Sequence, residues 1–190
     1  IPPEFGGPDI DLVTRTLLAI EMAQHRAGLY VPCYGVFGGA GLAQLFEATE
    51  DQKARYLYPT LAGEKKGFFG LSEPSGGSDP ARAIQTTAIQ DGDDWIINGG
   101  KLWISGAARA DYGLVFARTA PDRGRGGVTC FIVDTDTPGF HVRRIVHTLR
   151  SARYATELQF EDMRIPSANI LGELNKGFAI ASDRLTRQRI

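Results

Sequence analysis

The first third of the chain has apolar residues at the three-and-four spacing of an α-helix. Asp9 or Asp11 can cap a first helix at its N-terminus, and Gly28 is expected to end it. The spacing predicts that one side of this helix is buried. That side carries Ile10, Val13, Leu17 and Ile20.

A glycine-rich bend separates the first helix from two further predicted helices. The second is short, and its apolar side is formed by Leu42, Leu45 and Phe46. Thr49 and Gln52 have the spacing of a capping box, with Thr at the cap and Gln three residues on. They predict the start of a third helix, which passes through Leu61 and ends at Gly63.

From Lys66 to about Pro166 the apolar period changes to two and turn residues become frequent. The expected strands cover residues 84–90, 95–97, 102–105, 112–118, 128–134, 140–145 and 157–160. Turns are expected at 91–94 and 98–100, and an Arg- and Gly-rich loop at 121–127. Short strands with frequent turns predict an antiparallel barrel or sandwich rather than a parallel sheet.

A helix is expected again at the end of the chain, where Phe178, Ala181 and Leu185 share a face. The chain begins without methionine and ends inside this helix, so we expect it to be part of a longer polypeptide. The predicted fold class is α+β. Its domains are a partial helical domain over residues 1–65, a β domain over 66–168 and the start of a second helical domain over 169–190.

Composition narrows the functional classes. The 190 residues are 43% hydrophobic and 23% charged, and a net charge of −1 gives no electrostatic argument for nucleic acid or a membrane surface. No apolar run approaches the roughly 20 residues of a membrane span. Cys33 and Cys130 are far apart in the sequence, which favours a reduced compartment: the bacterial cytoplasm, or the mitochondrial matrix in a eukaryote. The three histidines lack metal-ligand spacing, so no metal is predicted.

Two segments carry the candidate chemistry. Residues 70–79 read Gly-Leu-Ser-Glu-Pro-Ser-Gly-Gly-Ser-Asp, and residues 98–105 read Asn-Gly-Gly-Lys-Leu-Trp-Ile-Ser. Each combines flexible backbone with hydroxyl side chains, and the second adds Trp103 between two apolar residues. Backbone amides and hydroxyls suit the polar edge of a flat cofactor, and an indole suits its face. Together the segments predict a site for a planar cofactor.

These segments resemble signatures of the acyl-CoA dehydrogenase family. Leu71–Pro74 with Gly77–Asp79 is similar to the family's flavin-site signature, and Ile97–Ser105 resembles the hairpin that follows it. Phe160–Pro166 resembles the family's exit from its β domain. The resemblance covers nearly the whole chain. Its less specific parts lie at residues 5–7, 49–57 and 171–178.

The resemblance implies FAD as the cofactor. Trp103 is expected against a face of the isoalloxazine ring, and Ser105 is expected to place a hydroxyl near flavin N5. A hydrogen bond that strengthens as the ring gains charge would favour the transition state over the ground state. The expected cofactor contacts, several of them through backbone, are Phe69, Leu71, Ser72, Gly77, Ser78, Trp103, Ile104 and Ser105.

The resemblance also implies an acyl-CoA substrate. Ser78 is expected to contact its CoA portion, and Arg189 matches an arginine near the CoA phosphates. Thr186, Arg187 and Gln188 occupy neighbouring contact positions. The other implied partners are an electron-transfer flavoprotein and further copies of the chain, as a dimer or tetramer.

The family reaction is α,β-desaturation of an acyl-CoA thioester, with a glutamate as the base. Some members hold that glutamate where Gln188 stands here, and a glutamine cannot accept the proton. We therefore predict no catalytic residue in this chain, no activity from it alone, and weak or absent FAD binding by it in isolation.

Two other functions stay open from the sequence. The same scaffold carries flavin-dependent oxidases and monooxygenases that act on substrates without CoA, and a degenerate paralogue would bind acyl-CoA or a partner without turnover. Within the motifs, Lys101 is expected to be a solvated or locally paired charge. Glu73 is expected to orient or cap the turn around Pro74 rather than act as a base.

Overall fold

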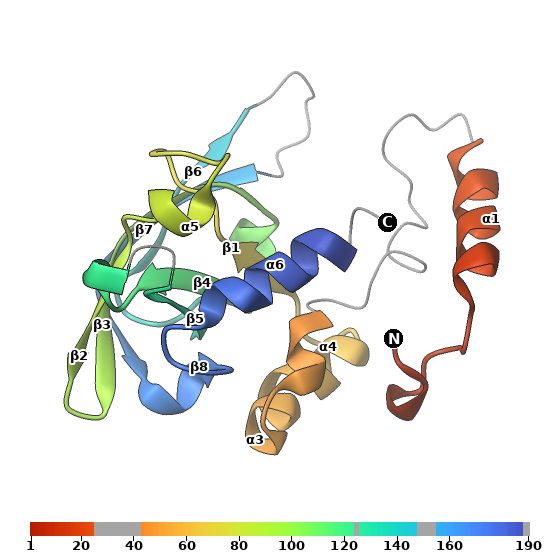
Figure 1. The fold of residues 1–190 in the computed structure, drawn as a ribbon, viewed down its shortest axis with the longest axis horizontal. Helices are drawn as coiled ribbons and strands as arrows, with labels where there is room; N and C mark the ends of the chain where they lie inside the picture. Colours follow the sequence, from red (N-terminus) through yellow and green to blue (C-terminus); the bar gives the residue numbers. More distant parts are fainter. Residues whose placement is uncertain (25–42, 124–125, 148–154, 188–190) are drawn as a thin grey trace.

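The computed structural model describes residues 1–24, 43–123, 126–147 and 155–187. Short helices precede a twisted β-sheet, and the last helix, α6 (Gly177–Arg187), packs back against β5 (Val128–Asp134). Figure 1 shows α1 (Leu12–Ala23) standing at one side of the molecule, away from the sheet. The expected α+β class is confirmed.

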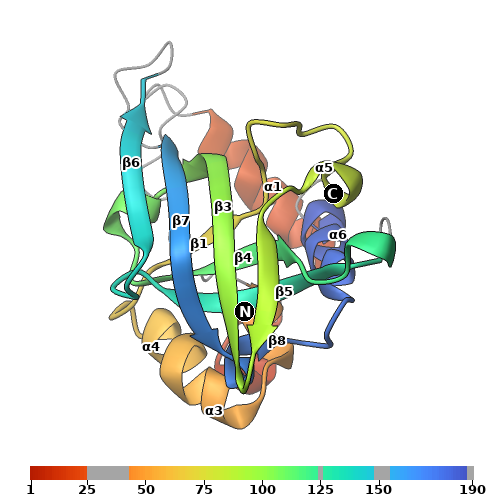
Figure 2. The same ribbon diagram turned by 90° about the vertical axis from the view of Figure 1, so that its left-hand side faces the viewer.

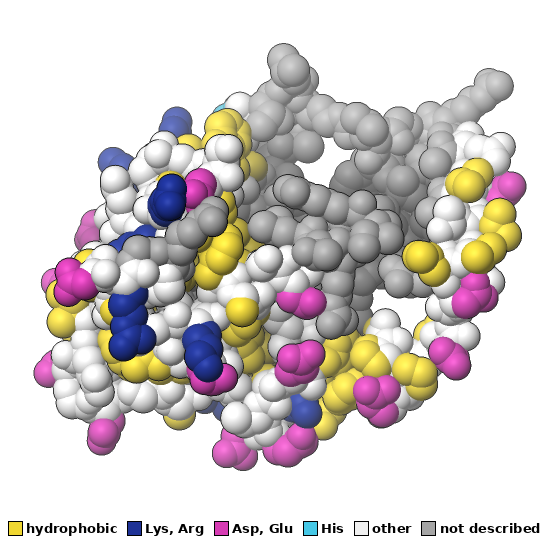
Figure 3. All heavy atoms as spheres, in the orientation of Figure 1, with side chains coloured by type: hydrophobic (Ala, Val, Ile, Leu, Met, Phe, Trp, Pro, Cys, Tyr) yellow, Lys and Arg dark blue, Asp and Glu magenta, His cyan; other side chains and the backbone are white. Residues whose placement is uncertain are grey.

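Helix α1 begins where the sequence predicts. The Asp11 carboxylate accepts hydrogen bonds from the backbone N–H groups of Val13 at 2.8 Å and Thr14 at 3.0 Å. The prediction of a buried face is wrong for the described residues, since Val13 is 68% and Leu17 is 58% exposed. Figure 3 shows hydrophobic side chains on the surface of the molecule where α1 lies. Periodicity therefore located the helix but not its partner. The predicted end at Gly28 lies outside the described residues.

The predicted third helix is continuous but changes type along its length. Thr49 Oγ1 accepts from the Gln52 backbone N–H, and Gln52 Oε1 accepts from the Thr49 N–H, both at 3.3 Å, so the capping box is confirmed. The predicted short second helix is a 3₁₀ turn, and its Leu42 lies outside the described residues. These elements are η2 (Ala43–Glu47), α3 (Glu50–Gln52), the π turn η3 (Lys53–Leu57) and α4 (Tyr58–Leu61).

Pro59 accounts for the π turn. Proline has no N–H to donate to the carbonyl of Arg55 four residues earlier. The N–H of Tyr58 reaches back five residues to the carbonyl of Lys53, as in a π-helix. The Arg55 carbonyl is satisfied instead by the ammonium of Lys65 at 3.1 Å. The proline is thereby tolerated, and the helix ends just before Gly63, as predicted.

Eight strands form a mixed, mostly antiparallel sheet in the order β6-β7-β3-β2-β4-β5-β8, while β1 pairs with β4 in parallel. Figure 2 shows β6, β7 and β3 side by side. The prediction of antiparallel pairing holds except for β1–β4 and one parallel pair between β2 and β4. The remaining strands are β1 (Gly67–Gly70), β2 (Thr87–Asp91), β3 (Asp94–Ser105), β4 (Tyr112–Arg118), β6 (Phe140–Val146), β7 (Ala155–Pro166) and β8 (Ile170–Leu171).

The core lies on both faces of the central strands. In β4, Leu114 belongs to a buried cluster with Tyr56 from the helical layer. The next residue, Val115, belongs to a second cluster with Trp95 and Phe160 on the other side. Successive residues of a strand point to opposite faces, so continuous apolar runs such as β4 and β5 mark strands covered on both sides. Both strands have their predicted bounds.

Strand β2 starts later than predicted, at Thr87 rather than Ile84. Residues 80–83 form a short helix, α5 (Pro80–Ala83). The backbone N–H groups of Gln85 and Thr86 then donate to the Glu73 carboxylate rather than to a neighbouring strand. A distant side chain therefore sets the beginning of this strand.

The predicted turn at residues 98–100 is wrong, because β3 runs unbroken from Asp94 to Ser105. Gly99 is needed for a different reason. It has a φ of 140°, and a Cβ built on it would lie 2.7 Å from the Cα of Thr86. Glycine here permits close approach of two backbones rather than chain reversal. Strand β7 is also longer than the predicted 157–160, since pairing with β3 extends it to Pro166.

Candidate flavin site

The two candidate segments meet in the structure. The backbone N–H of Leu102, in β3, donates to the backbone carbonyl of Ser72 at 2.9 Å. Residues 70–79 and 98–105 are therefore neighbours through direct main-chain contact, although about 30 residues separate them in sequence. The two segments that carry the candidate chemistry therefore touch, while the cofactor contacts predicted within them remain predictions.

A β-bulge makes this contact possible. Lys101 pairs with Leu158 of β7, and the next pair is Ile104 with Thr156. Between these pairs β3 has two residues and β7 has one, so β3 contains one extra residue. Leu102 and Trp103 form this bulge, which takes the Leu102 N–H out of the β7 ladder and frees it for Ser72. Trp103 has a φ of 64°, a conformation that bulky residues rarely adopt, and its side chain is 55% exposed.

Three serines offer hydroxyls around these segments. Among the described residues, the side chains of Ser72, Ser78 and Ser105 make no hydrogen bond, so each can meet a ligand. A Cβ built on Gly77 meets nothing within 4 Å, which leaves open space beside its backbone. Free hydroxyls and open backbone fit the polar edge and phosphates of FAD.

Three other predicted contacts have their side chains turned into the protein. Leu71 is 6% and Ile104 is 2% exposed, and they belong to the two core clusters. Phe69 packs with its ring centroid 5.0 Å from that of Phe116. The side chains of Leu71 and Ile104 are therefore core residues, and the backbone contact that the family resemblance implies for Phe69 and Leu71 remains a prediction.

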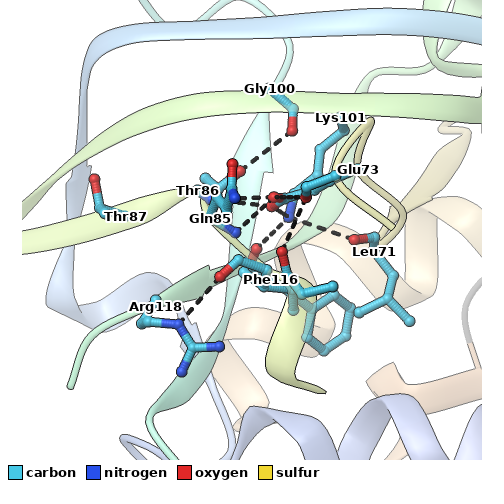
Figure 4. Close-up of polar contacts among 12 residues, drawn as sticks. Leu71, Glu73, Gln85, Thr86, Thr87, Gly100, Lys101, Phe116 and Arg118 are labelled. Carbon is cyan, nitrogen blue, oxygen red and sulfur yellow. Dashed lines mark hydrogen bonds and ion pairs between the residues drawn. The ribbon is translucent and has the colours of Figure 1, made fainter. Parts of the chain in front are cut away.

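A buried ion pair supports the site from inside (Figure 4). The Lys101 ammonium is fully buried and lies 2.7 Å from Glu73 Oε1, whose side chain is 4% exposed. It also donates to the backbone carbonyls of Phe116 at 2.5 Å and Leu71 at 3.5 Å. Of the two environments predicted for Lys101, solvated and locally paired, the second is found. The solvated alternative is wrong, because side chains at odd positions of this part of β3 face the core.

Glu73 joins the same network to the start of β2. Its carboxylate accepts the backbone N–H of Gln85 at 2.6 Å and that of Thr86 at 3.1 Å. The Thr86 hydroxyl in turn donates a hydrogen bond to the Gly100 carbonyl at 3.3 Å. These bonds agree with the orienting role predicted for Glu73, and they engage the carboxylate that a general base would need free.

Electrostatics keeps this pair charged at neutral pH. Burial lowers the pKa of Lys101 to about 8, because Glu73 only partly offsets the loss of water. Burial alone would raise the pKa of Glu73, but the charge of Lys101 and the hydrogen bonds from Lys101, Thr86 and Gln85 outweigh it and hold the pKa below its usual range. Nearby, burial raises the pKa of the Cys130 thiol, which therefore stays protonated.

A cleft on the described surface lies apart from the predicted cofactor contacts. A cleft of ≈ 370 Å³ lies beside the buried pair and is lined by Glu73, Gln85, Gly100, Arg143 and other polar residues. None of the eight predicted cofactor contacts lines it. This cleft is therefore separate from the predicted cofactor contacts.

The predicted CoA contacts at the end of the chain remain predictions. Thr186 and Arg187 lie in α6, and the structure does not describe their side chains. Gln188 and Arg189 lie outside the described residues. Within the described part, no group of three or more His, Cys, Asp or Glu side chains could hold a metal ion. None of the described helices has the length and apolar character to cross a bilayer.

The sequence analysis did not predict that Lys101 is fully buried, although the sequence carries a signal for it. Trp95, Ile97 and Lys101 are odd-numbered positions of one strand, and the first two are apolar. A period of two places all three on the inner face. The expected turn at 98–100 hid this continuity.

The comparisons with known proteins agree with the fold and the motifs. The model of the acyl-CoA dehydrogenase middle domain matches residues 68–163, and that of the N-terminal domain of the same enzymes matches residues 1–64. A β domain preceded by helices, with the two motifs in contact within it, thus defines a flavoprotein dehydrogenase scaffold. The chain belongs to the acyl-CoA dehydrogenase family.

Several relatives align along nearly the whole chain. The short-chain-specific acyl-CoA dehydrogenase of Clostridium acetobutylicum is 41% identical over 190 residues, which is 98% of this chain and 49% of that protein. An acyl-CoA dehydrogenase of Bacillus subtilis is 36% identical over all of this chain and 50% of its own length. A putative acyl-CoA dehydrogenase structure from Mycobacterium smegmatis superposes with a TM-score of 0.84 at 34% identity, covering 100% of this chain and 50% of that one. The chain spans about half the length of these relatives.

Proposed function

We propose that this chain supplies the flavin wall and part of the CoA site of an FAD-dependent acyl-CoA dehydrogenase. The observation that carries the proposal is the hydrogen bond from Leu102 N–H to the Ser72 carbonyl, which joins the two flavin motifs. A glutaryl-CoA dehydrogenase structure from Mycobacterium smegmatis in complex with FADH₂ is 36% identical to this chain, with a TM-score of 0.70 over 80% of it.

FAD, when bound, supplies an acceptor for the hydride that leaves the β-carbon of an acyl-CoA. The chain's own residues would hold and shield it. The hydroxyls of Ser72 and Ser105 would donate to the ring edge, and the Trp103 indole would exclude water from one face. The Ser78 hydroxyl and the open backbone at Gly77 would meet phosphate or the CoA portion of the substrate.

The proton acceptor lies elsewhere under this proposal. Gln188 cannot take the α-proton, since an amide has no basic site near neutral pH. We therefore propose that the base belongs to a longer polypeptide that contains this chain. The proposed electron acceptor is an electron-transfer flavoprotein. One relative, 34% identical, is named as a subunit of a caffeyl-CoA reductase-Etf complex. The proposed assembly is a dimer or tetramer in a reduced cellular compartment.

The first experiment is a titration of the 190-residue chain and of a polypeptide of the relatives' length with FAD, followed by absorbance and gel filtration. The longer polypeptide is expected to retain flavin, and the 190-residue chain to bind it weakly. Trp103→Ala and Ser105→Ala are expected to weaken binding about tenfold or more, each tenfold being 1.4 kcal/mol. Trp95→Phe, which alters a buried tryptophan of the core, is the matched control.

Turnover of the longer polypeptide separates the remaining alternatives. Desaturation of an acyl-CoA with an electron-transfer flavoprotein as acceptor supports a dehydrogenase. Rapid reoxidation by O₂ points to an oxidase, and binding of acyl-CoA without any reduction of flavin points to a non-catalytic paralogue. Absence of flavin from the longer polypeptide would contradict the proposal outright.

A reductase is a second candidate for the same site. The acryloyl-CoA reductase (NADH) of Anaerotignum propionicum is 37% identical over all of this chain. Dehydrogenation and reduction are the two directions of one reaction, so the same groups would serve both. The ratio of forward to reverse rates with saturated and α,β-unsaturated CoA esters decides between them.

A further inference from the structure

The Lys101 ammonium connects four segments that are separate in sequence. Its three protons match three acceptors: the Glu73 carboxylate, the Leu71 carbonyl and the Phe116 carbonyl of β4. Through Glu73 it also reaches the backbone at Gln85. Figure 4 shows these acceptors converging on one nitrogen between β3 and the neighbouring strands. A buried ammonium with every proton engaged cannot shift without losing a bond.

The bulge that carries Trp103 lies between two fixed points. Lys101 immediately precedes it and is fully buried, and Ile104 immediately follows it and is 2% exposed. Between them, Leu102 is bonded to Ser72 and Trp103 has its strained φ of 64°. A residue in a sparsely populated conformation persists only where its surroundings determine it. The anchors at 101 and 104 are the surroundings that do so here.

We propose that Lys101 is a positioning residue: its buried ammonium holds the bulge at Leu102 and Trp103 against Ser72, and so sets where the indole and the serine hydroxyls lie. The proposal deepens the proposed flavin function and rests on it for its ligand. Lys101 itself is enclosed by protein groups and touches no cofactor in this assignment. It acts through the backbone carbonyl of Leu71, next to Ser72, and through its own place in β3.

A charge-neutral pair of substitutions separates positioning from stability. Lys101→Met alone leaves the Glu73 carboxylate buried without its partner, which endangers folding. The double variant Lys101→Met/Glu73→Gln removes both charges and keeps similar volume, so it is the deciding protein. Lys176→Met is the matched control, because Lys176 forms an exposed ion pair with Glu173 outside this network.

The primary readout needs no ligand. Amide hydrogen exchange, followed by NMR of the 190-residue chain, reports how firmly the Leu102 N–H is held. We expect the folded double variant to exchange this amide at least about tenfold faster than wild type, while core amides of β4 stay protected. In a Trp95→Phe background, acrylamide quenching of the remaining Trp103 emission should change by at least about twofold, as expected for altered exposure. Lys176→Met should change neither.

The proposal is overturned if the folded double variant keeps both the Leu102 amide exchange rate and the Trp103 quenching within twofold of the wild-type values. Failure of both the single and the double variant to fold would also overturn it, because Lys101 would then serve the whole domain rather than the bulge. FAD titration adds a second arm: the double variant should raise the Kd about tenfold or more. If neither the wild-type 190-residue chain nor the longer polypeptide binds FAD, the proposed function is refuted. The Leu102 exchange rate and the Trp103 quenching would still decide the role of Lys101.

Discussion

At the scale of single residues, Trp103 shows local preference overruled by its surroundings. Its φ of 64° lies in the left-handed region that favours glycine, yet the residue is a tryptophan, which has the largest side chain of all. The cost of a left-handed backbone for an L-residue is about 1–2 kcal/mol. The sequence analysis expected this indole against a flavin face but did not predict its backbone conformation, because no residue around it signals a bulge.

A pair of substitutions tests that strain. Trp103→Gly and Trp103→Ala both remove the indole, and only the glycine relieves the backbone. We expect the glycine variant to be more stable than the alanine variant by about 1 kcal/mol, the reverse of their usual order within a strand. Urea unfolding of the two proteins measures the difference. An alanine variant at least as stable as the glycine variant would show that the angle carries no strain.

Glu73 makes a pH-dependent contribution to stability. Its pKa in the folded protein is held below the ordinary value, so the contribution is present above pH ~4.5 and is lost as the pH falls through the lowered pKa. Glu73→Gln should unfold more easily at neutral pH, by about 3–5 kcal/mol, because Lys101 keeps a buried charge without its partner.

The difference between wild type and Glu73→Gln should therefore narrow on acidification below pH ~4.5. Denaturant unfolding from pH 3 to 7 measures it. Glu50→Gln, which removes an exposed carboxylate paired with Lys53, is the control and should leave the free energy of unfolding nearly unchanged throughout. A constant difference for Glu73→Gln across this range would exclude the proposed linkage.

At the scale of elements, strands covered on both faces were the most predictable. The continuous apolar runs of β4 and β5 predicted the first and last residue of each strand correctly. The predicted bounds were wrong where contacts between distant residues determine them. Glu73 binds the backbone before β2, so that strand begins later than predicted, and pairing with β3 makes β7 longer. Gly99 permits a close approach of two backbones rather than a turn. Sequence proximity carries no information about those partners, whereas the cap at Thr49 depends on neighbours and was correctly predicted.

The capping box offers a test of that local rule. Thr49→Ala removes the acceptor for the Gln52 N–H and should destabilise the protein by about 1 kcal/mol. Thr137→Ala is the control, because the Thr137 hydroxyl makes no hydrogen bond within the described residues. Thermal unfolding of both variants measures the effect. Equal stability of the two would mean that the packing of Gln52, not its cap, holds this turn.

At the scale of the whole molecule, α1 presents an apolar face that the described residues leave uncovered. Leu12, Val13, Leu17 and Ile20 are each more than half exposed on it. Patches of this kind mark interaction surfaces or association in solution. The two segments 70–79 and 98–105, by contrast, are held in contact within the β domain by a backbone hydrogen bond from Leu102 to Ser72.

We expect the 190-residue chain to self-associate with rising concentration through this face. Leu17→Glu/Ile20→Glu should reduce the association, while Thr14→Glu/Leu18→Glu, on the other side of the same helix, should not. Sedimentation velocity over a concentration series measures both. A monomer at all concentrations would show that α1 is masked in solution.

The bulge in β3 has one more implication. A strand without it would need only one residue between two inward side chains, whereas two lie between Lys101 and Ile104. Deleting residue 103 should therefore leave the inward and outward pattern intact, and the shortened protein should fold with an unaltered core. The sheet carries one amino acid more than its architecture demands, and that surplus amino acid is the tryptophan beside the serine hydroxyls.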